Sequence, residues 1–307
     1  MLTVALLGAG CAGFSTEEPS GAGPTVLDVS PPDGARGVAA GTPIVLTFNE
    51  PVSESSARAA VTLSGIPNDE LDFSLDASGT ELTVAPRNGF AYASGTDAAS
   101  APMNSYAVTV STALTDREGT PLAEPFTSTF GTLRRVHQTV PNTLSGEYYT
   151  YALAVGGAVD ICSDRSASFR VGHTSSIAAS GDHHGVAAFE NALPEGVAEV
   201  EMAVLSGEQA TPSGSFYGDG VVELEQIPFQ TFDTTIDDAP VLTDFGAFTR
   251  DAGVERPQQV VLSALADGAA AGERSFMFRL SALDGPQNTF ANFYCDRFTL
   301  SVTYLVP

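Results

Sequence analysis

Hydrophobic and polar residues alternate with a period of two along most of the chain, which is the pattern of β-strands with one buried face. In the first half, the apolar positions of these runs are Ile44, Leu46 and Phe48; Leu82 and Val84; Val108 and Val110; and Phe126 and Phe130. Turn-forming sequences lie between the runs, at residues 31–34, 77–79 and 117–119. The pattern predicts a β-sandwich of about 110 residues that begins near Pro24.

The same alternation returns after residues 133–135 and continues to the end of the chain. Its apolar positions are Val200, Met202 and Val204; Val222 and Leu224; Phe276, Phe278 and Leu280; and Phe298, Leu300, Val302 and Tyr304. The polar positions between them include Glu199, Glu201, Glu223, Glu225 and Arg279. This is typical of antiparallel sheets with one wet face. About 170 residues of such strands predict a second, larger sandwich of the jelly-roll kind over residues 136–307. The fold class is therefore all-β.

Two segments of the first sandwich carry a family resemblance. Residues 29–38 read Val-Ser-Pro-Pro-Asp-Gly-Ala-Arg-Gly-Val, and residues 44–52 read Ile-Val-Leu-Thr-Phe-Asn-Glu-Pro-Val. They resemble the bacterial Ig-like domain first described in S-layer proteins, which has a Ser-Pro-x-Asp/Asn-Gly turn and then a strand ending in Phe-Ser/Asn-Glu-Pro-Val. The resemblance implies an Ig-like sandwich over residues 24–133 that serves as a spacer or presentation domain without catalytic residues. Residues 91–105 form a longer insertion than is usual in that family.

The second half more weakly resembles the DNRLRE-type β-sandwich found at the ends of secreted bacterial proteins. The matching stretches are residues 169–172, 185–190, 193–196, 200–205 and 298–304. The tryptophans characteristic of that family are missing, because this chain contains no Trp. The resemblance implies a fold and names no ligand.

The first eleven residues resemble the end of a bacterial lipoprotein signal peptide. An apolar run leads through three small residues to Cys11, the position that becomes the lipidated first residue of a mature lipoprotein. The run is short and lacks a basic n-region, which suits a signal that starts further upstream; a plain secretory signal or a disordered start is the alternative. Residues 12–23 predict a flexible tether. No later segment approaches the ~20 apolar residues of a membrane span, so we expect anchorage by lipid alone.

Lipidation of Cys11 would leave Cys162 and Cys295 as a pair in an exported protein, where disulfides persist. Each cysteine lies beside a strand-like run near one end of the second domain. We therefore predict a disulfide that joins the first and last strands of that domain. Two buried free thiols are the alternative.

The charge of the chain opposes binding to polyanionic partners. A formal net charge of −24, with 37 acidic residues and 13 basic residues that are all Arg, opposes binding to nucleic acid or to an anionic lipid surface. The same acidity favours a solvated surface or the recruitment of divalent cations.

Four residues are candidates for a metal site. His173, Asp182, His183 and His184 are of the types that bind Zn or Cu, although their spacing fits no standard site. Neighbouring histidines in a strand point to opposite faces, so at most one of the pair could join His173. A polar loop is the alternative interpretation.

Calcium is the other cation considered, because Asp-rich turns offer the oxygen ligands that it prefers. The aspartates concerned are Asp160, Asp164, Asp233, Asp237, Asp238 and Asp244. Their spacing does not match an EF-hand loop, and a loop kept polar for solubility is the alternative.

The sequence lacks the Gly-x-Ser-x-Gly turn of a serine hydrolase, and its alternating glutamates favour a solvent face over the facing carboxylates of a glycosidase. Aromatic residues could form a stacking platform for a sugar, with core packing as the alternative. They are Tyr148, Tyr149, Tyr151, Phe216, Tyr217, Phe290, Phe293 and Tyr294.

These features favour a non-enzymatic, exported lipoprotein at the cell surface, or in the outer membrane or periplasm. We expect it to need no cofactor and to act in adhesion or envelope assembly. The expected partner is a cell-envelope or extracellular protein or polysaccharide. A carbohydrate-binding protein is the first alternative, and a metal-dependent hydrolase is the second.

Overall fold

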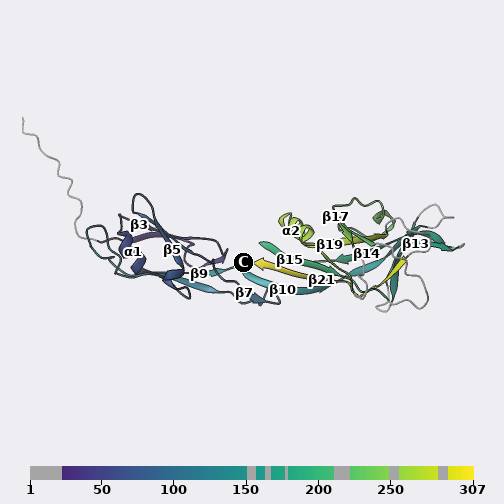
Figure 1. Ribbon diagram of the computed structural model, residues 1–307, viewed down its shortest axis with the longest axis horizontal. Helices are drawn as coiled ribbons and strands as arrows, with labels where there is room; N and C mark the ends of the chain where they lie inside the picture. The colour runs from purple at the N-terminus through teal and green to yellow at the C-terminus, as the bar shows by residue number, and fades with distance from the viewer. Residues whose placement is uncertain are drawn as a thin grey trace, which may run out of the picture. The chain divides into compact units, whose positions relative to one another are not determined.

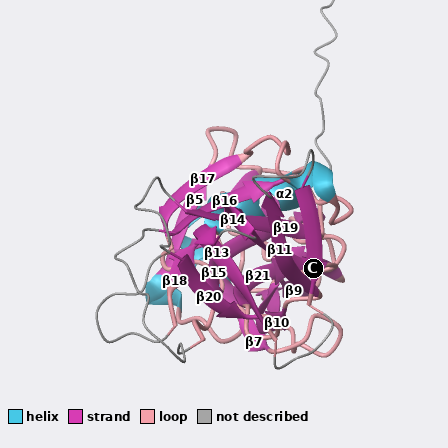
Figure 2. Ribbon diagram, turned by 90° about the vertical axis from the view of Figure 1, so that its right-hand side faces the viewer, coloured by secondary structure: helices cyan, strands magenta, loops and turns pink. Residues whose placement is uncertain are grey.

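A computed structural model describes residues 23–150, 157–162, 167–176, 179–210, 222–248, 256–282 and 290–307. Strands dominate this part of the chain, and its two α-helices are short (Figure 2). The predicted all-β class is therefore confirmed. The chain divides into two compact units, of which the first comprises residues up to 35, 41–89 and 106–130, and the second comprises residues 36–40, 90–105 and 131–307.

Two four-stranded sheets form the N-terminal sandwich. Their strand orders are β1-β3-β6-β5 and β2-β9-β8-β4. The strands are β1 (Val26–Ser30), β2 (Ala35–Val38), β3 (Ile44–Phe48), β4 (Val61–Leu63), β5 (Leu71–Leu75), β6 (Glu81–Pro86), β8 (Ser105–Val110) and β9 (Phe126–Thr132). The helix α1 (Glu54–Ala60) and the 3₁₀ turn η1 (Asn68–Glu70) lie in the connections.

The core of this sandwich follows the alternation in the sequence. Ile44, Leu46 and Phe48 of β3 are each at most 2% exposed. In the neighbouring strand, Val84 pairs with Ile44 and Leu82 pairs with Leu46, so that apolar side chains share one face of both strands. Burial of this face is the main force that holds the sheet against its partner.

The predicted turn at residues 31–34 is attached to strand β9. The Asp33 carboxylate accepts hydrogen bonds from the backbone N–H of Thr129 at 2.7 Å and from its hydroxyl at 3.0 Å. The Gly34 N–H in turn donates to the Thr129 carbonyl at 2.7 Å. Gly34 has a φ of 75°, a conformation that glycine adopts without steric cost. The Asp-Gly pair therefore fixes both the turn and its contact with β9.

The second unit is built on two larger sheets. One has the strand order β18-β15-β21-β10-β7, and the other has the order β12-β11-β14-β19-β16-β17, with β13 paired to β14 and β20 paired to β13. The elements are β7 (Ala93–Gly95), β10 (Arg134–Pro141), β11 (Leu144–Thr150), β12 (Gly157–Ile161), β13 (Ser168–Ser176), β14 (Ala179–Phe189), β15 (Glu199–Ser206), β16 (Val222–Ile227), η2 (Thr234–Ile236), β17 (Thr243–Ala247), β18 (Gln258–Val260), α2 (Leu262–Ala270), β19 (Phe276–Ala282), β20 (Phe290–Tyr294) and β21 (Thr299–Val306).

Strands β15, β21 and β10 lie side by side in the five-stranded sheet (Figure 1). The first long strand of this unit, β10, pairs antiparallel with the last strand, β21, along its whole length. Residues 90–105, which the sequence places inside the Ig-like domain, belong to this second unit. Within them, β7 pairs in parallel with β10, so the insertion extends the five-stranded sheet by one strand.

A bulge in β15 corrects one sequence prediction. The register between β15 and β21 shifts between Val200 and Met202, where one extra residue enters the strand. Beyond the bulge, Ala203 and Leu205 face the core with no exposed area, whereas Met202 is 45% exposed. The alternation had predicted Met202 on the buried face. The prediction was wrong because a one-residue bulge moves every later side chain of the strand to the other face, and the alternation did not reveal the bulge.

Stacked phenylalanines fill the centre of the second unit. Phe169, Phe248, Phe293 and Phe298 are each at most 2% exposed, and their rings form stacked or tilted pairs with centroids 5.6–6.5 Å apart. Aromatic pairs at such distances add stabilisation to the burial of their area. Phenylalanine side chains therefore fill the core of this unit in a chain that contains no tryptophan.

Candidate functional site

The four predicted metal ligands lie on the paired strands β13 and β14 but do not converge. His173 lies opposite Asp182, and its Nδ1 contacts the Asp182 carboxylate. His183 and His184 are adjacent in β14, so their side chains leave the sheet on opposite faces. Nowhere in the described part of the chain do three His, Cys, Asp or Glu side chains gather to hold a metal ion.

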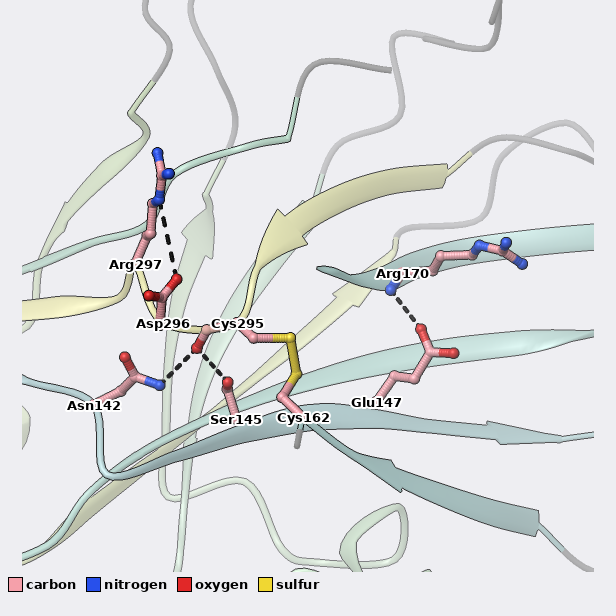
Figure 3. The surroundings of a disulfide bond; sticks show 8 residues. All are labelled: Asn142, Ser145, Glu147, Cys162, Arg170, Cys295, Asp296 and Arg297. Carbon is pink, nitrogen blue, oxygen red and sulfur yellow. Dashed lines mark hydrogen bonds and ion pairs between the residues drawn. A yellow bond between two sulfur atoms is a disulfide. The ribbon is translucent and has the colours of Figure 1, made fainter. Parts of the chain in front are cut away.

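His183 is packed against neighbours from strand β11. Its ring stacks on Tyr149 with centroids 5.5 Å apart, and its Nδ1 lies 3.6 Å from the Glu147 carboxylate. Only 7% of this side chain is exposed. The same carboxylate accepts a hydrogen bond from the backbone N–H of Arg170 (Figure 3). His183 therefore serves the packing of the sheet.

On the opposite face, a polar network begins at His184. Its Nδ1 lies 3.0 Å from the Ser281 hydroxyl, and its Nε2 lies 3.5 Å from the Asp237 carboxylate. The Ser281 hydroxyl is also 3.5 Å from the Glu225 carboxylate, which accepts a hydrogen bond from Arg279 Nε at 2.8 Å. Sequence reasoning missed this network, because its members come from three strands and a connection that are far apart in the chain.

Arg279 corrects another sequence prediction, since the alternation had placed it on a wet face and it is only 8% exposed. Its Nη1 donates to the carbonyls of Ile236 at 3.3 Å, Asp237 at 2.8 Å and Ala239 at 3.3 Å. These carbonyls belong to the connection between β16 and β17, which covers this face of the sheet. The guanidinium therefore holds the connection in place through charge-assisted hydrogen bonds.

A small apolar cluster surrounds this network. Its buried members are Tyr148, Val186, Ala188, Ile227, Phe232, Ile236, Ala239 and Met277. The cluster explains why Glu225, which we expected on a solvent face, has only 16% of its side chain exposed. Glu199 is exposed as expected. Glu201 instead forms an ion pair with Arg135 in which both N–O distances are 2.6 Å.

Burial is the main influence on His184, and it lowers the pKa of the imidazole from its usual value. The Asp237 carboxylate raises this pKa, and the Arg279 charge lowers it. Ser281, His184 and Asp237 are the residue types of a hydrolase triad, but Ser281 lies within strand β19 and its hydroxyl also faces Glu225. The arrangement fits a tie between the sheet and the connection that covers it.

Cys162 and Cys295 form the predicted disulfide, with their Cα atoms 5.9 Å apart (Figure 3). The bridge joins the ends of β12 and β20, and not the first and last strands as expected. The Cys295 carbonyl accepts hydrogen bonds from Asn142 Nδ2 at 2.8 Å and from the Ser145 hydroxyl. The disulfide therefore links the ends of β12 and β20 at a point where the Asn142 and Ser145 side chains also bind the backbone of Cys295.

Three of the six predicted calcium ligands, Asp233, Asp237 and Asp244, have other partners. Asp233 caps η2, because its carboxylate accepts hydrogen bonds from the N–H of Thr235 at 2.9 Å and from its hydroxyl at 2.6 Å. These bonds lower the pKa of Asp233. Asp244 accepts a hydrogen bond from the Gly246 N–H at 2.8 Å, and Asp237 faces His184. Asp164 lies outside the described residues.

The predicted aromatic platform is divided among several environments. Phe293 and Tyr148 are buried in two different clusters. Tyr149 stacks on His183, and Tyr294 lies 4.4 Å beneath the Arg297 guanidinium. The remaining candidates, Tyr151, Phe216 and Tyr217 and the side chain of Phe290, lie outside the described part of the chain.

A shallow groove lies on the outer face of the five-stranded sheet, with a volume of about 510 Å³. It is lined by Thr96, His137, Gln138, Thr139, Met202, Ser301, Val302 and Thr303. His137 Nδ1 lies 2.8 Å from the Thr303 hydroxyl, and the Thr139 and Ser301 hydroxyls are 3.4 Å apart. No pattern in the sequence pointed to this groove, because its residues come from β10, β15, β21 and the bend after β7, which are far apart in the chain.

Comparison with known families finds a match in the N-terminal part of the chain. Residues 21–132 match the family model of the bacterial Ig-like domain. This domain is of a non-catalytic type, in agreement with the resemblance found in the sequence. No curated protein matches the chain. Among the described residues, no helix is both long enough and apolar enough to span a membrane.

Solved structures resemble the chain only distantly. An L,D-transpeptidase from Mycobacterium smegmatis is 12% identical, with 74% of this chain and 75% of that chain covered and a TM-score of 0.25. The S-layer protein rSbsC is 16% identical, with 72% and 31% covered and a TM-score of 0.24. The glucan-utilisation protein SGBP-B from Bacteroides ovatus is 11% identical, with 92% and 52% covered and a TM-score of 0.21. Scores this low support no functional argument. The chain spans about a third of the S-layer structure and about half of SGBP-B.

Proposed function

We propose that this chain is a non-catalytic protein of the bacterial cell envelope, in which an Ig-like spacer presents the larger β-sandwich for adhesion or envelope assembly. The observation that carries the proposal is the Ig-like match over residues 21–132, because this domain type has no catalytic residues. A lipid at Cys11 would anchor the chain through the tether predicted over residues 12–23; Cys11 and residues 12–22 lie outside the described residues.

Two observations support the proposed role of the second sandwich as an exported binding module. A disulfide with a sequence separation of 133 residues closes it, and such bridges persist in oxidising compartments. Its polar network fastens the connection between β16 and β17 to the sheet. We expect the partner to be an envelope or extracellular protein or polysaccharide, since the charge of −24 opposes nucleic acid.

Cell fractionation with surface proteolysis tests this role. The chain, produced with its natural N-terminal segment in a bacterial host, should be found in the membrane fraction and should be cleaved when intact cells are treated with protease. The matched Cys11→Ser variant should move to a soluble exported fraction. Retention of that variant in the membrane fraction, or a cytoplasmic location of the unaltered chain, would contradict the proposal.

A further inference from the structure

The groove on the outer face of the five-stranded sheet has the chemistry of a binding site. We propose that it binds an uncharged, polyhydroxylated ligand, namely a segment of a neutral polysaccharide. This inference rests on the proposed role of the second unit as a binding module. It adds the site and the chemical class of the ligand.

The first argument is the density of hydroxyl groups. Four of the eight lining residues are Thr96, Thr139, Ser301 and Thr303, and they belong to or follow the neighbouring strands β7, β10 and β21. Each hydroxyl can donate one hydrogen bond and accept two, so it adapts to either role of a sugar hydroxyl. The His137 ring adds one further polar group, because its Nδ1 contacts the Thr303 hydroxyl and its other nitrogen can donate or accept according to the tautomer. This surface therefore complements a ligand that carries a hydroxyl on most carbons.

The second argument is the absence of fixed charge. The described residues that line the groove include no Asp, Glu or Arg, although the chain has 37 acidic residues. Three charged side chains lie within two residues of the lining in the sequence. Arg135 and Glu201 are paired with each other at 2.6 Å, and Asp97, which follows Thr96, accepts a hydrogen bond from the Ala99 N–H at 2.6 Å. Among the described lining residues, an anionic ligand would meet no Arg and a cationic ligand would meet no carboxylate. The groove therefore fits a neutral ligand better than a charged one.

The third argument is the position of Met202. The bulge in β15 turns this side chain away from the core and into the groove, where it is 45% exposed. Bulges often re-aim a side chain beside a functional site. A methionine is flexible and apolar, so it can pack against the C–H face of a sugar ring in the absence of a tryptophan. The groove thus combines an apolar contact with several hydroxyls, the combination typical of ligand sites, and its volume lies in their usual range.

Isothermal titration of the purified full chain tests the proposal. The probes are neutral hexasaccharides built from glucose, mannose, galactose or xylose, with a uronic-acid hexasaccharide as the charged comparison. At least one neutral probe should bind saturably, and the charged probe should not. Thr139→Val and Met202→Ala should each weaken binding by roughly three- to tenfold, the effect of losing one hydrogen bond or one apolar contact.

Both variants alter exposed residues, so they should fold like the unaltered chain, which circular dichroism checks. The matched controls are Thr62→Val and Leu27→Ala, which make the same kinds of change at exposed positions of the first unit and should leave binding unaltered. Binding that Thr139→Val and Met202→Ala do not weaken would overturn the assignment of the groove. Failure of every neutral probe to bind would overturn the ligand class.

These outcomes are separate from the proposed function. A chain that is present at the cell surface but binds no neutral hexasaccharide would refute the groove assignment and leave the surface role intact. A chain that is absent from the envelope would refute the surface role whatever the groove binds.

Discussion

The Arg279 guanidinium lies 2.8 Å from the Glu225 carboxylate, and both side chains are largely buried beneath the connection between β16 and β17. Taking two charges out of water is costly, and their mutual attraction offsets this cost only when further hydrogen bonds complete the site. Arg279 meets this condition through the carbonyls of Ile236, Asp237 and Ala239. The position of the connection between β16 and β17 therefore depends on the side chain of Arg279.

Replacement of Arg279 by Ala should destabilise the second unit by about 3 kcal/mol or more, because it leaves a buried carboxylate and three carbonyls without their partner. Calorimetry of thermal unfolding measures the change. The double variant Arg279→Met with Glu225→Gln should recover much of the loss, since it removes both charges. The control Arg87→Ala breaks an exposed ion pair with Asp72 and should have little effect. Equal losses in Arg279→Ala and Arg87→Ala would contradict the structural role of the buried pair.

Acidification should weaken the same region through His184. Its pKa in the folded protein is lowered below the usual 6.5, first by burial, so the neutral imidazole is the form that the fold favours. The stabilisation is thus complete above pH 6.5 and is lost as the pH falls from 6.5 through the lowered pKa. The groups that face the ring are Asp237, Arg279, Asp182, Glu225 and Ser281.

The midpoint of thermal unfolding, followed between pH 7.5 and pH 5, measures this effect. The decrease with falling pH should be smaller in His184→Gln, which keeps a polar group but cannot take up a proton. An identical decrease in both proteins would show that other groups cause it.

Removal of the disulfide should cost about 4–5 kcal/mol in the chain-entropy model, because Cys162 and Cys295 are separated by 133 residues. The double variant Cys162→Ala with Cys295→Ala, compared with the oxidised chain in urea, provides the measurement. Reduction of the unaltered protein should lower the stability of the same unit by a similar amount. A variant as stable as the oxidised chain would show that the bridge contributes nothing to the fold.

In the first unit, Asp76 organises the turn between β5 and β6. Its carboxylate accepts hydrogen bonds from the Ser78 side chain and from the backbone N–H groups of Gly79, Thr80 and Glu81. The Ser78 bond is the largest cause that lowers the pKa of Asp76 to about 2. The stabilisation from this turn is therefore present above pH 3.8 and is lost as the pH falls through about 2.

An NMR titration of the Asp76 carboxyl carbon should give a midpoint near 2. In Ser78→Ala, which removes the largest cause, the midpoint should move toward 3.8. A midpoint near 3.8 in the unaltered protein would contradict the hydrogen-bonded turn.

The elements that could be predicted from the sequence are those whose pattern is local. The alternation of Ile44, Leu46 and Phe48 predicted a buried strand, and the Asp33-Gly34 pair predicted the turn at residues 31–34. The cysteine pair was also predicted, because only its chemistry and compartment were needed. The strands that the bridge joins were not, since sequence carries no distance between two cysteines.

The missed features depend on contacts between distant segments. The burial of Arg279 and Glu225 follows from a connection that folds back over the sheet, and alternation alone cannot show that a polar face is covered. The bulge before Met202 reversed the side chains of half a strand without changing the sequence pattern. Both the polar network and the groove result from such events, so local reasoning could not find either site.

Intact-protein mass spectrometry of material purified from the native membrane, with and without reduction, tests the central claim most directly. The account predicts a mature N-terminus at Cys11 that carries acyl mass, and a gain of about 2 Da on reduction from the bridge between Cys162 and Cys295. An unmodified N-terminus would contradict the lipid-anchored envelope protein proposed here. An unchanged mass on reduction would contradict the disulfide that closes its second unit.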